Sequence, residues 1–403
     1  FVGIGGDSLF FVMVSIAIEE YLGYLPENWE GTSIEMLESY KDGEDSGLCD
    51  IARNKGIYSI ALICFFLILG ELFLQARVYY KIGRSALALL TDQSTTVFHE
   101  SIGVTTYRPN LQLTDAKSDA PTMEINEVGL RSDPIPTTHT DTRIAILGAS
   151  TVAGAYAESN NKTFPLLFGR LLAENDDDDY HVINAGIEGH TLAHTQKLFD
   201  GLVSSLAPDV VMLYPGFNDI TLLCRAQSEP QTPMYDGIGY PQLPTWVLSK
   251  EIIRKNTTQL RASNVPSQDI LQPSDVDPKE YGDRIRQLVT SIRAQKMTPA
   301  LITVSRSYRN VAESTAFALA QESLYYYSCL NSDGLIAIGE MYNEQIRLVA
   351  KEMNAPLFDL AKVMPGGRKY FVDGGHFTFA GEQYVANFLF QQFKQLNIML
   401  DKK

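Results

Sequence analysis

The chain has 403 residues, with 33 basic and 48 acidic side chains and a formal net charge of −15 at pH 7. Nucleic-acid binding depends on Lys and Arg contacts to phosphates, so this balance argues against a nucleic-acid partner. Hydrophobic residues make up 45% of the chain, which is enough to bury one large core or two ordinary ones.

The first segment, residues 1–56, is predicted to be membrane-associated. Residues 9–18 are apolar, but this length falls short of the ~20 residues that cross a bilayer. A longer span would bring Glu19 and Glu20 into the membrane, which is costly. We therefore expect an interfacial or partner-packed helix, with a second span as the alternative, followed by an acidic loop over residues 26–50.

Residues 57–84 are predicted to form a transmembrane helix and its basic flank. The segment 57–74 reads IYSIALICFFLILGELFL and contains one charge, at Glu71. A buried core helix is the alternative. Basic residues lie on both sides, so the positive-inside rule does not decide the orientation. The lipid bilayer is the expected partner, and the N-terminal helices could also dock a membrane protein.

Residues 85–141, which we call the connector, are polar and contain several prolines. We expect them to pack on the edge of the domain that follows, residues 142–403. In that domain, strand-like and helix-like segments alternate. The expected strands are Arg143–Gly148, His181–Ala185, Asp209–Tyr214, Pro299–Val304 and Pro356–Leu360, and the expected helices are Phe164–Glu174, Leu192–Leu206, Lys279–Gln295, Leu335–Met353 and Phe379–Gln395.

Helices of this length between strands predict crossover connections and a parallel sheet covered on both faces. Sites in such sheets lie beyond the carboxyl ends of the strands. Two insertions, residues 221–277 and 306–333, follow strands at that edge. They are candidates for a lid or a substrate wall, with surface elaboration or a protein interface as the alternative.

The cysteines form no C-x-x-C pair, so neither a zinc site nor a thioredoxin-type pair is indicated. Cys224 and Cys329 lie in the same predicted domain. They could form a disulfide if that domain is extracytoplasmic, but free buried thiols are the expected state.

Ser150 follows a buried apolar strand and Gly148, at the point where a turn should open into a helix. Unpaired N–H groups at a helix start would stabilise an oxyanion formed beside its hydroxyl. A plain helix cap is the alternative for an isolated serine.

Three further polar blocks come at strand ends or just before a helix: residues 184–191, 214–219 and 373–378. His376 could act as general base to Ser150, and Asp373 could orient its imidazole. The N–H groups of Ser150 and Gly189 and the side-chain amide of Asn218 would form the oxyanion hole.

In these blocks the chain resembles the SGNH (GDSL-type) hydrolase family. The resemblance covers residues 143–403, and the connector matches the lead-in of membrane-anchored members. It implies a flavodoxin-like three-layer α/β/α sandwich, hydrolysis or transfer of an ester acyl group, and no cofactor or metal. Ala149 departs from the pattern, because many members have Asp between the Gly and the Ser. The motifs are Gly148-x-Ser150, Asn184-Ala185-Gly186-x-x-Gly189, Gly216-x-Asn218-Asp219, Asp373-x-x-His376, Tyr107-x-Pro109-Asn110 and Asn126-x-x-Gly129-Leu130-Arg131.

His190 and His194 are spaced i, i+4, but no carboxylate or Cys nearby completes a metal site, so we expect surface or helix-start histidines. Asp219 is expected to structure its turn and not to act as a base.

The leading hypothesis is a membrane-anchored serine esterase or O-acyltransferase. It would face the periplasm or the cell exterior and act on acylated carbohydrate or a cell-envelope polymer. The alternative is a catalytically inactive SGNH-fold subunit of a membrane complex. A nucleotide-binding protein is disfavoured, since no Gly-rich phosphate loop follows the first strand.

Overall fold

A computed structural model of the chain describes residues 62–77, 79–80, 95–114, 121–138, 141–175, 179–216, 218–227, 248–249, 270–324 and 326–395. The predicted helix 9–18, the loop 26–50, residues 57–61 of the predicted span and most of the insertion 221–277 lie outside the described residues. The chain divides into two compact units, Phe1–Ala88 with Pro244–Glu251 and Leu89–Leu243 with Ile252–Lys403.

Within the first unit, residues 62–77 are helical, in agreement with the helical part of the segment predicted to span. Glu71 accepts hydrogen bonds from the backbone N–H groups of Leu248 and Ser249, both at 2.8 Å. Of the helices in the described residues, none has the length and apolarity needed to cross a membrane. Large apolar side chains on this helix are exposed, among them Ile63, Phe65, Leu67, Ile68, Leu72 and Phe73.

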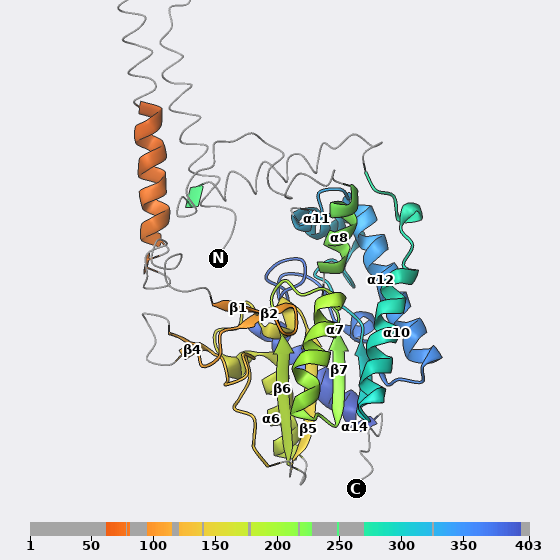
Figure 1. Ribbon diagram of the computed structural model, residues 1–403. Helices are drawn as coiled ribbons and strands as arrows, with labels where there is room; N and C mark the ends of the chain where they lie inside the picture. The colour runs from red at the N-terminus through yellow and green to blue at the C-terminus, as the bar shows by residue number, and fades with distance from the viewer. Residues whose placement is uncertain are drawn as a thin grey trace, which may run out of the picture. The chain divides into compact units, whose positions relative to one another are not determined.

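The second unit is built on a five-stranded parallel sheet, as predicted (Figure 1). Its central strands are buried on both faces, which explains why they read as continuous runs of Val, Ile and Leu instead of alternating. The strands in spatial order are β6 (Tyr180–Gly186), β5 (Thr142–Gly148), β7 (Val210–Tyr214), β8 (Thr298–Ile302) and β9 (Leu357–Phe358).

Helices cover both faces of this sheet. The chain moves from β5 to β6 in one direction and then from β6 through β7 and β8 to β9 in the other, and right-handed crossovers therefore place the helices on opposite faces. On one face α6 (Phe164–Asn175) packs with α14 (Phe379–Gln395); on the other, α10 (Lys279–Ala294) packs with α7 (Leu192–Gly201) and α12 (Ser332–Glu352). The unit is thus a three-layer α/β/α sandwich.

Helix boundaries differ from the predictions by more than one residue at two places. The expected helix Leu192–Leu206 ends at Gly201 and continues as the 3₁₀ turn η4 (Val203–Leu206). Helix α12 begins three residues earlier than expected, because the Asn331 side chain accepts a hydrogen bond from the Gly334 N–H and caps it. The insertion 306–333 contains a further helix, α11 (Glu313–Ser323).

The connector forms two antiparallel strand pairs, β1 (Thr96–His99) with β2 (Val104–Tyr107) and β3 (Gln112–Thr114) with β4 (Pro121–Glu124). Its apolar side chains join the core of the second unit, among them Val104, Tyr107, Ile125 and Leu130, each at most 4% exposed.

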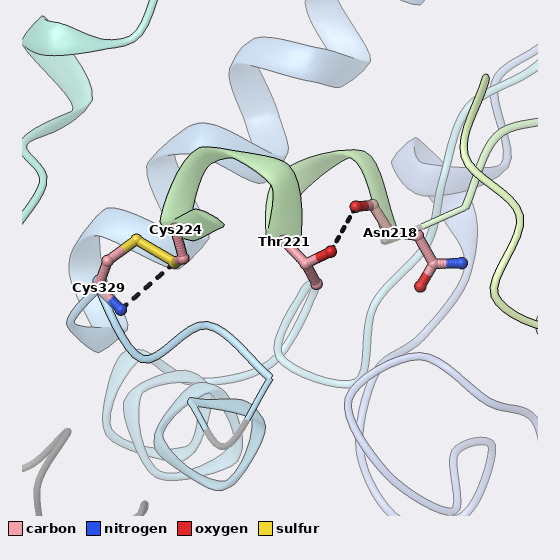
Figure 2. The surroundings of a disulfide bond; sticks show 4 residues. All are labelled: Asn218, Thr221, Cys224 and Cys329. Atoms are coloured by element: carbon pink, nitrogen blue, oxygen red, sulfur yellow. Dashed lines mark hydrogen bonds between the residues drawn. A yellow bond between two sulfur atoms is a disulfide. The ribbon is translucent and has the colours of Figure 1, made fainter. Parts of the chain in front are cut away.

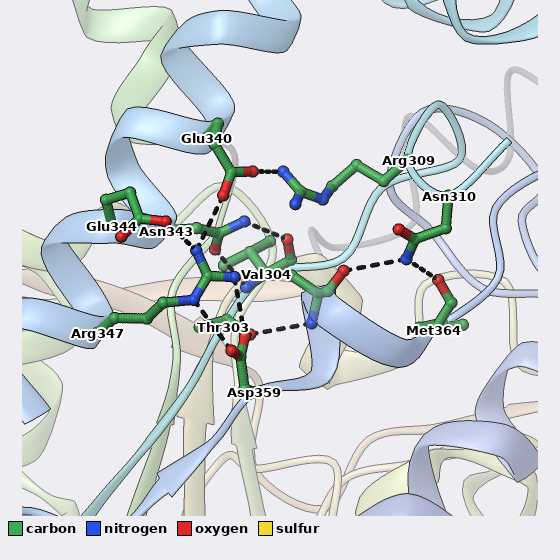
Figure 3. Close-up of polar contacts among 11 residues, drawn as sticks. Thr303, Val304, Arg309, Asn310, Glu340, Asn343, Glu344, Arg347, Asp359 and Met364 are labelled. Atoms are coloured by element: carbon green, nitrogen blue, oxygen red, sulfur yellow. Dashed lines mark hydrogen bonds and ion pairs between the residues drawn. The ribbon is translucent and has the colours of Figure 1, made fainter. Parts of the chain in front are cut away.

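A polar network holds the chain as it leaves β8 (Figure 3). The Asp359 carboxylate accepts two hydrogen bonds from Arg347 on α12, at 3.0 and 2.9 Å, and one from the Thr303 hydroxyl at 2.8 Å. Burial raises the pKa of the Asp359 carboxyl, but these bonds lower it below its ordinary value, so the carboxylate stays charged. Asn343 adds two bonds to the Val304 backbone. The loop that begins at residue 303 is therefore anchored at its base.

Candidate active site

Ser150 begins a short helix, α5 (Ser150–Ala153), directly after β5. The N-cap is Ala149, which makes no side-chain cap hydrogen bond, so the Ser150 hydroxyl does not serve as a helix cap. The backbone around it is packed so closely that two glycines are needed. A Cβ on Gly148 would lie 2.5 Å from the Tyr214 carbonyl oxygen, and one on Gly186 would lie 2.2 Å from the Ala153 nitrogen.

The structure brings the three predicted residues Ser150, His376 and Asp373 together. The Ser150 Oγ lies 2.7 Å from His376 Nε2, and His376 Nδ1 lies 2.7 Å from Asp373 Oδ2. A carboxylate only accepts hydrogen bonds, so Nδ1 carries the ring proton and Nε2 is free to accept from the serine hydroxyl. This is the protonation pattern that a general base needs.

The loop that carries His376 and Asp373 is held by backbone hydrogen bonds. Phe371 and Phe377 pair across it as an isolated antiparallel bridge. The Ser307 N–H donates to the Gly374 carbonyl at 3.1 Å, which ties the loop to the anchored segment after β8. The loop thus cannot carry the imidazole away from Ser150 without breaking several bonds.

Asp373 is set to remain ionised. Burial raises the pKa of its carboxyl, but hydrogen bonds from the His376 ring and from the backbone N–H groups of Gly375 and His376 bring it below the ordinary value. A charged carboxylate at this position stabilises the imidazolium that forms when His376 takes a proton.

Of the predicted oxyanion donors, Asn218 lies beside the turn that carries Ser150. Asn218 Nδ2 donates one hydrogen bond to the His190 carbonyl at 2.8 Å, and the amide has a second N–H to offer. A Cβ on Gly216 would lie 2.6 Å from that of Ala149 and 3.7 Å from Asn218 Nδ2, so the amide sits next to the turn of Ser150. Gly189 has a φ of +78° with open space around it.

Asp219 holds a helix start. Both of its carboxylate oxygens lie 3.1 Å from the Leu192 N–H at the beginning of α7, so Asp219 holds a segment outside its own turn. Burial raises the pKa of this carboxyl to about 7, although the bond from Leu192 opposes the shift.

Of the two expected positions, surface or helix start, the surface is wrong for His190: it lies directly before the N-cap of α7 and is 4% exposed. Its Nε2 donates to the Thr105 carbonyl at 2.8 Å, and burial lowers the pKa of its ring to about 4. His194 lies at the start of α7 and takes part in its capping box.

The expectation of free thiols at Cys224 and Cys329 was also wrong, because the two form a disulfide (Figure 2). Cys224 lies on α8 (Asn218–Gln227), the helix that begins with the proposed oxyanion donor Asn218. Cys329 lies between α11 and α12, so the bond joins the helix of Asn218 to the insertion 306–333.

Tyr156 was not anticipated from the sequence. Its ring centroid lies 5.3 Å from that of His376, and the residue is 54% exposed. Burial, together with the charges of Asp373 and Glu188, raises the pKa of its hydroxyl to about 12. It lies in an irregular turn after α5 with no periodic pattern, so no sequence signal marks it.

Among the residues that the structure describes, no group of His, Cys, Asp and Glu could hold a metal ion. The proposed chemistry rests on side chains and backbone N–H groups.

Residues 146–384 match the model of the GDSL-like lipase/acylhydrolase family, which is more than half of the chain. The protein belongs to this family. Its members hydrolyse ester bonds, and the parallel sheet with helices on both faces is the fold expected for a GDSL-type acylhydrolase. A comparison with curated proteins found no match.

Solved structures similar to this GDSL-type chain include an acetyl xylan esterase (16% identity, TM-score 0.39, 62% of this chain and 98% of that one). Others are an alpha/beta hydrolase enzyme from the metagenome of Lake Arreo, Spain (16%, 0.41, 64% and 96%) and a lipase/acylhydrolase from Enterococcus faecalis (18%, 0.39, 63% and 96%).

Proposed function

We propose that the protein is a membrane-anchored serine esterase or O-acyltransferase that works through an acyl-serine intermediate. The observation that carries the proposal is the 2.7 Å contact between Ser150 Oγ and His376 Nε2. The other ring nitrogen of His376, Nδ1, contacts Asp373. An inactive subunit has no need of this hydrogen-bonded set, so the geometry favours the enzyme over the scaffold.

In the proposed reaction, Ser150 Oγ attacks the ester carbonyl carbon while its proton passes to His376 Nε2. The oxyanion accepts hydrogen bonds from the Ser150 and Gly189 N–H groups and from Asn218. His376 then gives the proton to the leaving alkoxide, and an acyl-serine remains. Water deprotonated by His376 releases the acid, or an acceptor hydroxyl takes the acyl group by the same route.

We infer a carbohydrate ester as the substrate from the surroundings of His376. The half-exposed ring of Tyr156 offers an apolar face beside the imidazole, which suits the C–H face of a sugar ring. Glu188 and Asp373 act electrostatically on the same tyrosine. The exposed Glu188 carboxylate would accept hydrogen bonds from sugar hydroxyls, and the two negative charges would repel an anionic polymer, so a neutral acylated sugar fits best.

We further propose that the catalytic unit faces the periplasm or the cell exterior. Structural disulfides persist in oxidising compartments and are rare in the cytosol, so the Cys224–Cys329 bond supports this side of the membrane. Residues 57–74 would supply the anchor, since apolar side chains of the helical residues 62–77 are exposed. Sedimentation of the full chain with membranes after carbonate extraction tests the anchor.

The activity is tested with p-nitrophenyl acetate on wild-type protein and on Ser150→Ala purified in parallel. Wild type is expected to hydrolyse the ester and the variant to lose at least about a thousandfold in kcat. Equal rates for the two proteins would refute the proposal. Adding a neutral oligosaccharide separates the reactions: transfer raises p-nitrophenol release above acetate release, whereas hydrolysis keeps them equal.

A further inference from the structure

The connector precedes residues 146–384, the part of the chain that the family model matches. We propose that the connector nevertheless positions groups of the active site. Arg131 fixes the turn that carries Ser150, and the Thr105 carbonyl fixes Asn218 through His190. The inference rests on the proposed esterase function and assigns positioning residues to it.

Arg131 uses its whole guanidinium group to hold the turn after Ser150. The residue is 3% exposed, and it makes five hydrogen bonds, which matches the five N–H donors of the group. Three of the five acceptors are backbone carbonyls in the last residue of α5 and in the turn that follows. The acceptors are the Asn160 side chain at 3.0 Å and the carbonyls of Ala153 at 3.1 Å, Gly154 at 2.5 Å, Ala157 at 3.1 Å and Thr122 at 2.9 Å.

Helix α5 has only one turn, so its position depends on contacts at its two ends. At its start, β5 leads directly into Ser150. At its end, the carbonyls of Ala153 and Gly154 would be buried without these partners, which is costly. Arg131 therefore fixes the distal end of the turn whose first residue is the nucleophile.

The sequence around Arg131 is built to present it. The Asn126 side chain accepts hydrogen bonds from the N–H groups of Val128 and Leu130, at 3.2 and 3.0 Å, and closes a tight turn. Gly129 has a φ of +85°, and a Cβ there would lie 2.6 Å from the Tyr107 carbonyl oxygen. The Asn126-x-x-Gly129-Leu130-Arg131 motif is thus explained as a turn that directs the guanidinium beneath α5.

A second series of hydrogen bonds runs from β2 to the proposed oxyanion donor Asn218. His190 Nε2 donates to the Thr105 carbonyl at 2.8 Å, and the His190 carbonyl accepts from Asn218 Nδ2 at 2.8 Å. A carbonyl acceptor requires a proton on Nε2, and the buried ring stays neutral near pH 7. The connector thereby sets the plane in which the Asn218 amide offers its remaining N–H.

Arg131→Met removes the hydrogen bonds to the turn after α5, and His190→Ala removes the hydrogen bond to Thr105. Two conservative variants are made beside them. His190→Gln keeps a side-chain N–H that can reach Thr105, so it is expected to restore activity. Arg131→Lys keeps the charge but lacks the planar guanidinium with its five N–H donors, so it is expected to lose activity like Arg131→Met. It replaces Arg131→Met in the test if that variant does not fold.

The matched control is Arg143→Met. Arg143 is also buried, at 5% exposure, and donates to the carbonyls of Pro136 at 2.7 Å and Thr138 at 3.0 Å in the same connector. It lies near the amino end of β5, away from Ser150. Arg143→Met is expected to lower the unfolding temperature without changing kcat per active site.

The readout is kcat for p-nitrophenyl acetate, divided by the concentration of Ser150 titrated with a fluorophosphonate. Unfolded protein does not react with the probe and is therefore left out of this concentration. A displacement of about 1 Å at a catalytic group can cost about a hundredfold in rate, and we expect losses of roughly ten- to a hundredfold for Arg131→Met and His190→Ala with KM little changed. Wild-type kcat per titrated site in both variants would overturn the inference. Failure of wild type to react with the probe would instead refute the proposed function.

Discussion

Replacing Asn218 by Ala removes a proposed oxyanion donor without touching Ser150, His376 or Asp373. The Asn218 amide donates one N–H to the His190 carbonyl at 2.8 Å and so is held in place before any substrate arrives. A pre-oriented donor of this kind contributes about 2.7–4 kcal/mol to the transition state, which corresponds to ~10²–10³ in kcat. We expect Asn218→Ala to lose that factor in kcat for p-nitrophenyl acetate, with KM little changed.

Thr221→Val is the control for this prediction. The Thr221 hydroxyl donates to the backbone carbonyl of Asn218 at 2.6 Å, on the same helical turn, but not to its amide (Figure 2). Losing that bond costs about 1 kcal/mol of stability and should leave kcat within about threefold of wild type. If Asn218→Ala also kept kcat within threefold, the amide would not stabilise an oxyanion, and the reasoning would be refuted.

Three other changes test separate parts of the account. The buried Glu382 carboxyl accepts a hydrogen bond from the Phe164 N–H at 2.7 Å, and burial raises its pKa to about 8. Between pH 4.5 and 8, the free energy of unfolding of wild type should therefore fall relative to that of Glu382→Gln, by up to about 1.4 kcal/mol per pH unit. Urea unfolding at several pH values measures this. Tyr156→Ala should raise KM about tenfold for an acetylated neutral disaccharide and leave p-nitrophenyl acetate kinetics unchanged. Replacing both Cys224 and Cys329 by Ala should lower the free energy of unfolding by about 2–4 kcal/mol.

Each of these has an outcome that contradicts it. The sign for Glu382 follows from a folded pKa above the unfolded value: its contribution is complete below pH 4.5 and lost by pH 8, so parallel pH profiles for wild type and Glu382→Gln would be inconsistent with it. For Tyr156, an equal loss on both substrates would point to a role in orienting His376 and not in binding a ring. For the cysteines, a reductant should lower the free energy of unfolding of wild type only. An equal loss in the variant without Cys224 and Cys329 would show that the disulfide does not cause the destabilisation.

The convergence of Ser150, His376 and Asp373 could be expected from the sequence. Each follows an apolar strand or precedes a helix, and the carboxyl ends of parallel strands meet at one edge. Long periodic helices such as α10 and α14 were recognised for a similar reason, since one apolar face repeats along each of them.

The positions of other groups could not be expected, because they depend on contacts between distant segments. The sequence left the pairing of Cys224 with Cys329 open, and only the fold decides it, since it joins residues 105 positions apart. Arg131 and His190 bind backbone carbonyls, and a carbonyl leaves no trace in the sequence. Helix α11 lies in the insertion 306–333, where the sequence predicts no helix, because its apolar residues form no clear stripe.

The central claim is that Ser150 is an activated nucleophile, and covalent labelling tests it most directly. A fluorophosphonate incubated with the native protein should add one adduct, which peptide mass spectrometry assigns to Ser150. The same probe should not label His376→Ala at a comparable rate, because the serine then lacks its base. An unlabelled wild-type protein, or an adduct on another residue, would contradict the account.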